Sequence, residues 1–214
     1  MNPNNKFVIT INRELGSGGR TIGRKLAEKL GVEYYDKALI QALQEKYRLS
    51  VEEIEKLKGQ EQGWWSDFKR KIGISADDVY YAKEDDSREL LETEDVFRTE
   101  TEFLKSIAKE ESCVIAGRSG FYIFRDHPNH LGIFIQASML SRVARVASEQ
   151  KMTKEEARIT IEKIDQMREN YIKEHTGTSR YDTRNYQLVL STDELTEDAA
   201  VEIIMAFIRN MNKE

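Results

Sequence analysis

A short apolar run that leads into a glycine-rich segment constrains this chain more than any other feature of its sequence. Residues 7–11 read Phe-Val-Ile-Thr-Ile, a β-branched run typical of a buried central strand. The glycine-rich segment 16–19 cannot continue the strand, but it allows positive φ and lets backbone N–H groups close around an anion. From Ile22, apolar residues recur four apart until Gly31, which is placed to end a helix. The stretch therefore predicts a strand, an anion-binding loop and a helix N-terminus in succession.

The spacing is close to the phosphate-loop pattern G-x-x-x-x-G-K-[ST] but does not match it at every position. Gly18 takes the second glycine position, but Arg13 stands in place of the first glycine and Gly19 in place of the lysine. Arg20 follows directly, and Thr21 falls where loops ending in G-K-G-T carry a threonine that can bind Mg²⁺. An arginine fork differs from a lysine ammonium in reach and angle. We therefore expect phosphate binding here, whereas phosphoryl transfer depends on whether Arg20 replaces the lysine.

Two alternatives to a phosphate loop remain open. Gly16 and Gly18, with Asp36 lying 20 residues after Gly16, also fit the start of a dinucleotide-binding fingerprint. The third glycine of that fingerprint would have to be Thr21, a poor residue for close packing of a helix on a strand. A glycine-rich turn without a ligand is the second alternative. Phosphate binding is favoured over both because strand, loop and helix are all in place.

Composition limits the fold and the partners. The 214 residues suit one sizeable α/β domain, and 39% hydrophobic with 33% charged residues is typical of a folded, soluble chain. A net charge of −5 disfavours nonspecific binding to nucleic acid or to anionic membranes. Cys113 is the only cysteine and lies in an apolar run, so we expect a small core residue and no internal disulfide. The first residues lack an apolar signal segment and no run reaches membrane-spanning length, which predicts a cytoplasmic protein.

Beyond the first helix, short apolar runs alternate with helical patterns. Strand-like runs lie at residues 32–35, 113–116, 131–135 and 186–190. Helical periodicity follows the capping residues Ser138, Thr153 and Thr196, and a seven-residue spacing of apolar residues predicts a long helix within 84–107. The alternation predicts an α/β fold with a five-stranded parallel sheet, the first strand in its middle and helices on both faces. Residues 38–105 are then a helical insertion between two strands.

Six short motifs occur in a fixed order along the chain. They are Asn12 to Arg20, Tyr35 to Lys37, Val114 to Arg118, Phe134 to Ala137 with Arg142, Asp165 to Arg168, and Asn185-Tyr186. Together they resemble the cytidylate kinase-like group of P-loop nucleoside monophosphate kinases. The resemblance runs from residue 7 to about residue 208 and is loose over residues 44–100. It implies one P-loop kinase-like domain over residues 1–214, with an acceptor-binding insertion and a lid at about 165–185.

The resemblance implies a donor site at the glycine-rich segment. The ATP phosphates are then held by the backbone amides of Gly16, Ser17, Gly18 and Gly19, with Arg13, Arg20 and Thr21 completing the site. Asp36 ends the second expected strand and, with Thr21, is expected to bind Mg²⁺, partly through water. Phosphoryl transfer requires neutralised charge and excluded water, so Arg20 is expected to act in catalysis.

The resemblance also implies an acceptor site. Arg118 matches the glycine–arginine pair that cytidylate kinases use on the acceptor nucleotide, and Asp165 with Arg168 matches their D-x-x-R motif. Asp36 and Arg142 complete the expected substrate-binding residues, and Arg118 and Arg168 are also expected to be catalytic. The structural alternatives are an ion pair for Arg118 and a solvated helix face for the others. The glycine–arginine pair is favoured as a ligand site, because open α/β sheets bind ligands at the C-terminal ends of strands.

Further basic residues have weaker claims to a role. The resemblance implies a lid in which Arg168, Lys173, Arg180 and Arg184 exclude water. However, arginines at positions such as 142 and 145 of a helix most often only solvate its face, and residues 180 and 184 lie in a polar segment that would serve equally as a connector. The three histidines, His127, His130 and His175, share no metal-ligand spacing.

The expected function is ATP- and Mg²⁺-dependent phosphoryl transfer to a nucleoside monophosphate, with CMP or dCMP as acceptor. One alternative is a noncatalytic nucleotide-binding or regulatory protein that keeps the loop without turnover. Another is a kinase of a non-nucleotide acceptor, since the insertion that would select the base matches the family least. The expected partners are small nucleotides, and neither nucleic acid nor a membrane. The sequence gives no oligomeric state.

Overall fold

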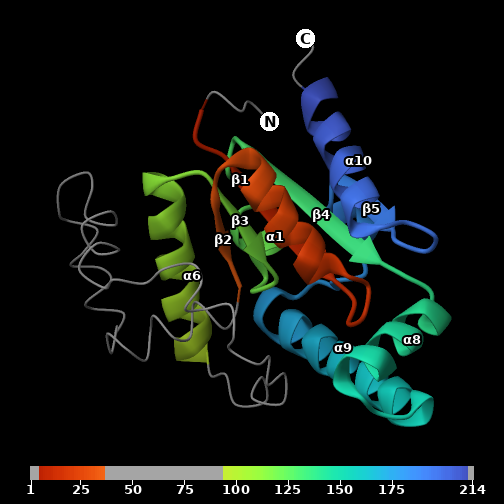
Figure 1. Cartoon of the computed structure of the whole chain (residues 1–214). Helices are drawn as coiled ribbons and strands as arrows, with labels where there is room; N and C mark the ends of the chain where they lie inside the picture. The colour runs from red at the N-terminus through yellow and green to blue at the C-terminus, as the bar shows by residue number, and fades with distance from the viewer. Residues whose placement is uncertain (1–4, 37–93, 212–214) are drawn as a thin grey trace, which may run out of the picture.

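The computed structural model describes residues 5–36 and 94–211, in which strands and helices alternate (Figure 1). The strands are β1 (Val8–Arg13), β2 (Glu33–Tyr35), β3 (Cys113–Ala116), β4 (His130–Gln136) and β5 (Leu188–Ser191). The helices are α1 (Gly19–Leu30), α6 (Glu94–Glu110), α7 (Gly120–Ile123), α8 (Met139–Gln150), α9 (Lys154–Thr176) and α10 (Glu197–Asn210), with a short 3-10 turn, η2 (Thr183–Asn185).

The strands form one parallel sheet in the order β2-β3-β1-β4-β5. Ile9 of β1 lies opposite Val114 of β3 on one side and Leu131 of β4 on the other. Both neighbours cover β1 and helices cover both of its faces, so Val8, Ile9 and Ile11 are fully buried. This explains why the first strand reads as a continuous apolar run rather than an alternating one. The predicted parallel sheet with this strand in its middle is confirmed.

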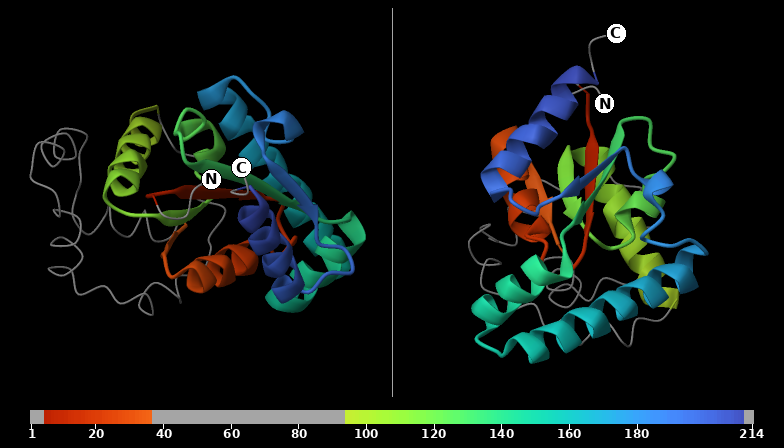
Figure 2. Two further views of the ribbon diagram at one scale, coloured as in Figure 1. Left: turned by 90° about the horizontal axis from the view of Figure 1, so that it is seen from above. Right: turned by 90° about the vertical axis from the view of Figure 1, so that its right-hand side faces the viewer.

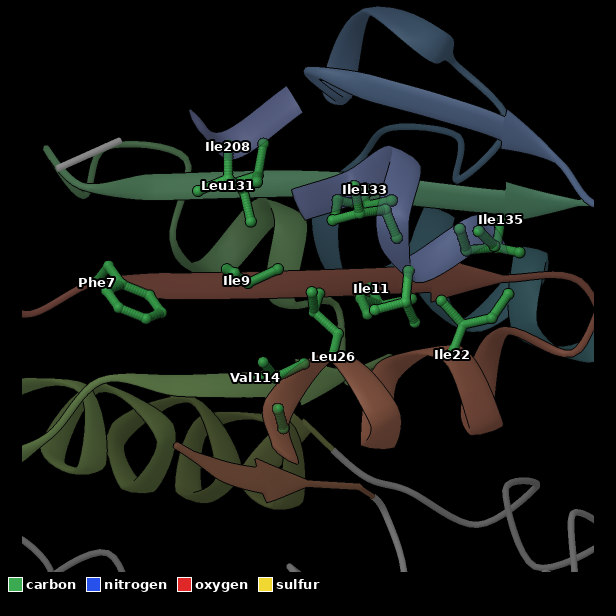
Figure 3. Close-up of a cluster of buried hydrophobic side chains, with 14 residues drawn as sticks. Phe7, Ile9, Ile11, Ile22, Leu26, Val114, Leu131, Ile133, Ile135 and Ile208 are labelled. Atoms are coloured by element: carbon green, nitrogen blue, oxygen red, sulfur yellow. The ribbon is translucent and has the colours of Figure 1, made fainter. Parts of the chain in front are cut away.

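Helices lie on both faces of the sheet, as expected (Figure 2). On one face, α1 and α10 pack side by side and enclose the main apolar core with β1 and β4 (Figure 3). Ile22 and Leu26 of α1 and Ile208 of α10 meet the isoleucines of the sheet there. On the other face, α7 and the C-terminal part of α9 enclose a smaller cluster that contains Phe121 and Ile172. These layers bring the C-terminal ends of β1, β3 and β4 to one edge, where ligands bind in such sheets.

Local signals placed the C-terminus of α1 and the N-termini of α8, α9 and α10 correctly. Gly31 adopts a left-handed conformation directly after α1, and Ser138, Thr153 and Thr196 each accept a hydrogen bond from the first turn of the helix that they precede. Cys113 is fully buried, which confirms it as a small core residue, and burial raises the pKa of its thiol far above the ordinary range. Among the described residues, no helix is both long and apolar enough to cross a membrane.

Several boundaries differ from the sequence-based expectation. β1 continues through Arg13, two residues beyond the apolar run, because its pairing with β4 extends to Ile135. α1 begins at Gly19 rather than near Ile22. On α10, Val201 is buried, whereas Ile203 is 39% exposed.

The expected insertion and lid are only partly described. Most of the predicted insertion at 38–105 lies outside the described residues, and α6 forms its last part. The expected lid at 165–185 corresponds to the second half of α9, the segment after it and η2. Its closing motion stays a prediction.

Candidate functional site

The segment between β1 and α1, residues 14–18 and hereafter the glycine loop, has the backbone geometry of an anion site. Gly16 and Gly18 have φ of 81° and 78°, in the left-handed region that favours glycine. Gly18 is the N-cap of α1, so no capping side chain accepts a hydrogen bond from the first amides of the helix. The first turn of α1 also contains no acidic residue. The positive end of the helix dipole therefore points out of the C-terminal edge of the sheet with no carboxylate of its own turn to neutralise it.

The glycine loop is fixed by contacts from distant parts of the chain. The Ser17 hydroxyl is buried and donates to the carbonyl oxygen of Glu14 at 2.8 Å. Thr192, which follows β5, donates its hydroxyl to the carbonyl oxygen of Ser17 at 2.8 Å. The amide of Leu15 donates to Oδ1 of Asp165 in α9 at 3.1 Å. The loop is thus held in shape before any ligand arrives.

The glycines of this segment have close neighbours of their own. A Cβ on Gly16 would lie 2.9 Å from the carbonyl oxygen of Arg142, and one on Gly18 would lie 2.7 Å from Nη1 of Arg145. The guanidinium of Arg145 therefore lies beside the N-cap of α1, where it also pairs with Glu197. The sequence suggested only a solvated helix face for Arg145. In the structure, Arg145 lies close to where an anion would meet the N-terminus of α1.

Arg20 and Asp36 bind each other in this structure. Nη2 and Nε of Arg20 donate to Oδ2 of Asp36 at 2.9 and 3.2 Å. Arg20 was expected to take the place of the missing lysine, and Asp36 to bind Mg²⁺. The Arg20 guanidinium is thus paired with Asp36, which follows β2, and the Arg20 side chain is 29% exposed. The roles of both residues toward nucleotide stay predictions.

Asp165 is the centre of an arginine cluster formed by Arg142, Arg168 and Arg180. Nη1 of Arg142 donates to Oδ2 of Asp165 at 2.5 Å, while Nη1 of Arg180 and of Arg168 lie 3.7 and 4.0 Å from Oδ1. Arg142 and Asp165 are both buried. The D-x-x-R pair and Arg142 are therefore brought together beside the glycine loop. The alternative that Arg142 only solvates a helix face is wrong, because α8 packs that face on α9.

Arg180, which the sequence suggested only as a lid residue or as part of a polar connector, is the most deeply buried arginine of this cluster. It is completely buried, and its Nη2 donates to the carbonyl oxygen of Arg13 at the end of β1. Its backbone is held as well, since its amide donates to Glu169 and its carbonyl accepts from the hydroxyl of Tyr186. Burial, followed by the charge of Arg168, lowers the pKa of Arg180. The interpretation of this position as a simple polar connector is wrong.

Glu14 adds a second, partly buried carboxylate beside the cluster. Its Oε2 accepts from the amide of Ala137 at 3.1 Å and lies 3.7 Å from Nε of Arg142. Burial raises the pKa of Glu14, and the Arg142 charge only partly opposes this. No sequence signal pointed to Glu14, because its partners lie more than 120 residues away along the chain.

Arg118 lies at the C-terminal end of β3, as expected for a residue at the ligand edge of the sheet. Its φ of 53° is left-handed, its side chain is buried, and it forms an ion pair with the equally buried Glu100 of α6. The structural alternative of an ion pair is therefore present. A role on an acceptor stays a prediction and would require Arg118 to exchange or share this partner.

The residues present fit a nucleotide-bound Mg²⁺ better than a metal held by protein alone. The described residues contain no group of three or more His, Cys, Asp or Glu side chains placed to hold a metal ion. Mg²⁺ is commonly held by one or two protein groups together with substrate phosphates. Thr21, in the first turn of α1, and Asp36 fit that limited role.

The imidazole of His130 forms a hydrogen bond with the hydroxyl of Thr10 at 2.7 Å, and burial lowers the pKa of His130 to about 4.

Comparisons with known proteins agree with this architecture. The chain is 25% identical to the cytidylate kinase of Methanopyrus kandleri over 94% of this chain and 92% of that protein. It is 27% identical to the cytidylate kinase of Pyrococcus furiosus over 98% of this chain and 92% of that protein.

Solved structures share the fold of P-loop kinases. An uncharacterized protein from Eubacterium ventriosum has a TM-score of 0.69 at 23% identity, over 95% of this chain and 99% of that chain. The shikimate kinase of Bacteroides thetaiotaomicron has a TM-score of 0.51 at 14% identity, over 95% of this chain and 98% of that chain. At such identities the likeness concerns the fold. The sequence evidence is more specific: residues 8–194 match the cytidylate kinase-like family, and the chain belongs to that family.

Proposed function

We propose that this protein transfers the γ-phosphoryl group of ATP to a nucleoside monophosphate, CMP or dCMP, with Mg²⁺. The observation that carries the proposal is the glycine loop with left-handed Gly16 and Gly18, which opens at the N-terminus of α1 beside buried arginines. Membership of the cytidylate kinase-like family supports nucleotides as substrates. Free nucleotides as substrates would also place the protein in the cytoplasm.

Charge neutralisation is the main contribution that the chain can make to this reaction. An oxygen of the acceptor phosphate forms a bond to the γ-phosphorus, while the bond to the β–γ bridging oxygen breaks and its electron pair leaves with ADP. Backbone amides of residues 16–21 would bind the donor phosphates, and Mg²⁺, when bound with the nucleotide, would neutralise part of their charge. Loop contacts that already exist, such as Thr192 to Ser17, keep these amides in place without reorganisation.

The acceptor would bind across the ends of β3 and α9. Arg118 and Arg168 are the proposed contacts to its phosphate, because an arginine fork binds phosphate oxygens in a bidentate manner. Asp165, also expected to bind the acceptor, accepts from Arg142 at 2.5 Å and lies 4.0 Å from Arg168, so it would hold these arginines in position for the acceptor. A lid formed by residues 165–185 would exclude water around them.

One observation favours a noncatalytic alternative. Gly19 stands where a phosphate loop carries its lysine, and Arg20 is paired with Asp36. A protein with this arrangement would bind nucleotide and lack turnover unless another cation serves the phosphates.

A coupled assay of ADP release separates these functions. The protein would be mixed with ATP, Mg²⁺ and one acceptor at a time, the acceptors being CMP, dCMP, UMP, AMP, GMP and shikimate. Thermal shift with ATP, ADP and CMP would be measured alongside. Release of ADP that depends on CMP or dCMP supports the proposal. Stabilisation by ATP without turnover on any acceptor supports the binding protein, and turnover only on shikimate supports a non-nucleotide acceptor.

A further inference from the structure

Two of the departures from the phosphate-loop pattern, those at residues 13 and 19, lie in contact with each other. The pattern has a glycine at its first position and a lysine directly after its second glycine. This chain has the reverse, an arginine at the first position, Arg13, and a glycine at the lysine position, Gly19. A Cβ built on Gly19 would lie 2.7 Å from Cβ and 3.3 Å from Cγ of Arg13. The stem of Arg13 therefore occupies the space in which a side chain at position 19 would begin.

Space, rather than backbone conformation, is what requires glycine at position 19. Gly19 is the first residue of α1, and its φ is not in the left-handed region, unlike those of Gly16 and Gly18. A residue with a side chain would fit its backbone. The conflict with Arg13 follows from the strand, because alternate residues of a strand share a face. Arg13 lies on the same face as Ile9 and Ile11, whose side chains pack in the core beneath α1.

The guanidinium of Arg13 lies near the C-terminal ends of β1 and β3. A Cβ on Gly117, directly after β3, would lie 2.9 Å from Nη1 of Arg13. Because β3 is the neighbour of β1, the side chain runs from the end of β1, past the first residue of α1, to the end of β3. Its charged group thus lies at the ligand edge of the sheet, close to the helix N-terminus and to Arg118.

The backbone of Arg13 is fixed by the buried arginine of the adjoining cluster. Nη2 of Arg180 donates to the carbonyl oxygen of Arg13, and the Arg13 amide donates to the side chain of Asn12 at 3.2 Å. Arg20, the other arginine near the loop, is directed to Asp36. Of these two, Arg13 is the one whose stem already fills the position of the missing lysine.

We infer that Arg13 is the cation of this phosphate loop and binds oxygens of the β- and γ-phosphates of ATP. This inference rests on the proposed binding of ATP and deepens it, because it names the residue that replaces the lysine. The exchange of positions is then reciprocal: Arg13 supplies the charge, and Gly19 leaves the space that its stem requires. Loss of the charge weakens binding of ATP more than binding of ADP, since only ATP carries the γ-phosphate.

A cycle of four proteins tests this reciprocity: the natural chain, Arg13→Gly, Gly19→Lys and the double variant. The dissociation constants of ATP and ADP with Mg²⁺ are measured for each, together with kcat/KM where turnover exists. We expect Arg13→Gly to weaken ATP binding about tenfold to a hundredfold, the loss of one charge-assisted contact. Gly19→Lys alone should be at least as damaging, because its stem meets Arg13. The double variant, which restores the first glycine and the lysine of the pattern, should recover to within about tenfold of the natural chain, a strong non-additivity for residues in contact.

Two further variants keep the test decisive if a member of the cycle folds poorly. Arg13→Met retains the stem over Gly19 and removes the charge, so it should keep the melting temperature without ligand and lose ATP affinity more than ADP affinity. Arg158→Ala removes an arginine that is 60% exposed on α9 and should leave both affinities unchanged. The inference would be overturned if Arg13→Met bound ATP as tightly as the natural chain does. It would also be overturned if the loss of ATP affinity in the double variant equalled the sum of the losses in the two single variants.

The binding measurements separate this inference from the proposed function. If the natural chain binds ATP but turns over no acceptor, the proposed kinase fails while the role of Arg13 in binding remains measurable. If the natural chain turns over CMP and Arg13→Met does so equally well, only the inference fails.

Discussion

The glycine loop and the arginine cluster around Asp165 lie side by side, but different contacts hold them together. The glycine conformations of the loop and the start of α1 are specified by residues close together in the sequence, although Thr192 and Asp165 also hold the loop from a distance. The cluster joins α8, α9 and the segment before β5 through buried charges, and Asp165 meets Leu15 from 150 residues away. Sequence patterns therefore locate the first region, while only the fold assembles the second.

The largest effect should come from filling the glycine loop. Gly18→Val places a branched side chain at φ 78° and against the guanidinium of Arg145, 2.7 Å from the position of the new Cβ. We expect nucleotide binding to be lost, because the loop amides can no longer close around phosphate. Isothermal titration with ATP measures this loss. Gly31→Val, also left-handed but with open space around it, controls for backbone strain alone, and unchanged ATP affinity in Gly18→Val would exclude the loop as the site.

The second effect concerns the cluster. Asp165→Ala leaves three arginines without their shared carboxylate and should lower the free energy of unfolding by about 3–5 kcal/mol, as for a broken buried ion pair. Urea denaturation measures the change. Asp126→Ala, which removes an 89% exposed partner of Arg125, should cost no more than about 1 kcal/mol. Similar losses in the two variants would mean that the cluster does not act as a structural unit.

The third prediction separates the two arginines proposed to bind the acceptor. Arg168→Ala should lower kcat/KM for the acceptor by about tenfold to a hundredfold while the affinity for ATP is kept, since one charge-assisted contact is worth about 1.5–3 kcal/mol. Arg118→Ala should do the same and also lower the melting temperature, because it leaves Glu100 buried without its partner.

A second substitution sharpens this difference. Arg118→Ala combined with Glu100→Gln should recover stability but not acceptor kinetics. If the melting temperature and the acceptor kinetics recover together, Arg118 is only a structural residue. Equal losses of ATP and acceptor affinity in Arg168→Ala would mean that the acceptor site lies elsewhere.

The smallest effect is the pH dependence due to Glu14. Burial raises the pKa of Glu14 in the folded protein above its ordinary value of 4.5. The folded state thus favours the protonated carboxyl, and this stabilisation is present below pH 4.5 and lost as the pH rises through the higher folded pKa. The stability of the natural chain relative to Glu14→Gln should therefore fall as the pH rises through that interval. Thermal unfolding at several pH values measures it, and a rise instead of a fall would contradict the partly buried position of Glu14.

Much of the fold was predictable because its signals are local. The apolar run of β1, the left-handed Gly31 and the caps at Ser138 and Thr153 each depend on residues within a few positions of one another. The same is true of Gly16 and Gly18 in the loop.

Side-chain partners at the site were not predictable in the same way. Arg180 looked like part of a polar connector, and its burial depends on β1 and Tyr186 folding around it. Arg20 looked like the substitute for lysine, and its direction depends on Asp36 at the end of another strand. Periodicity and motif spacing carry no information about which of several arginines will meet which carboxylate.

The most direct measurement is the rate of ADP release by the natural chain with ATP and Mg²⁺, in the presence and absence of CMP. The account predicts that CMP or dCMP raises this rate well above that with ATP alone, even though Gly19 occupies the lysine position. Saturable ATP binding with no increase from any nucleoside monophosphate would contradict it.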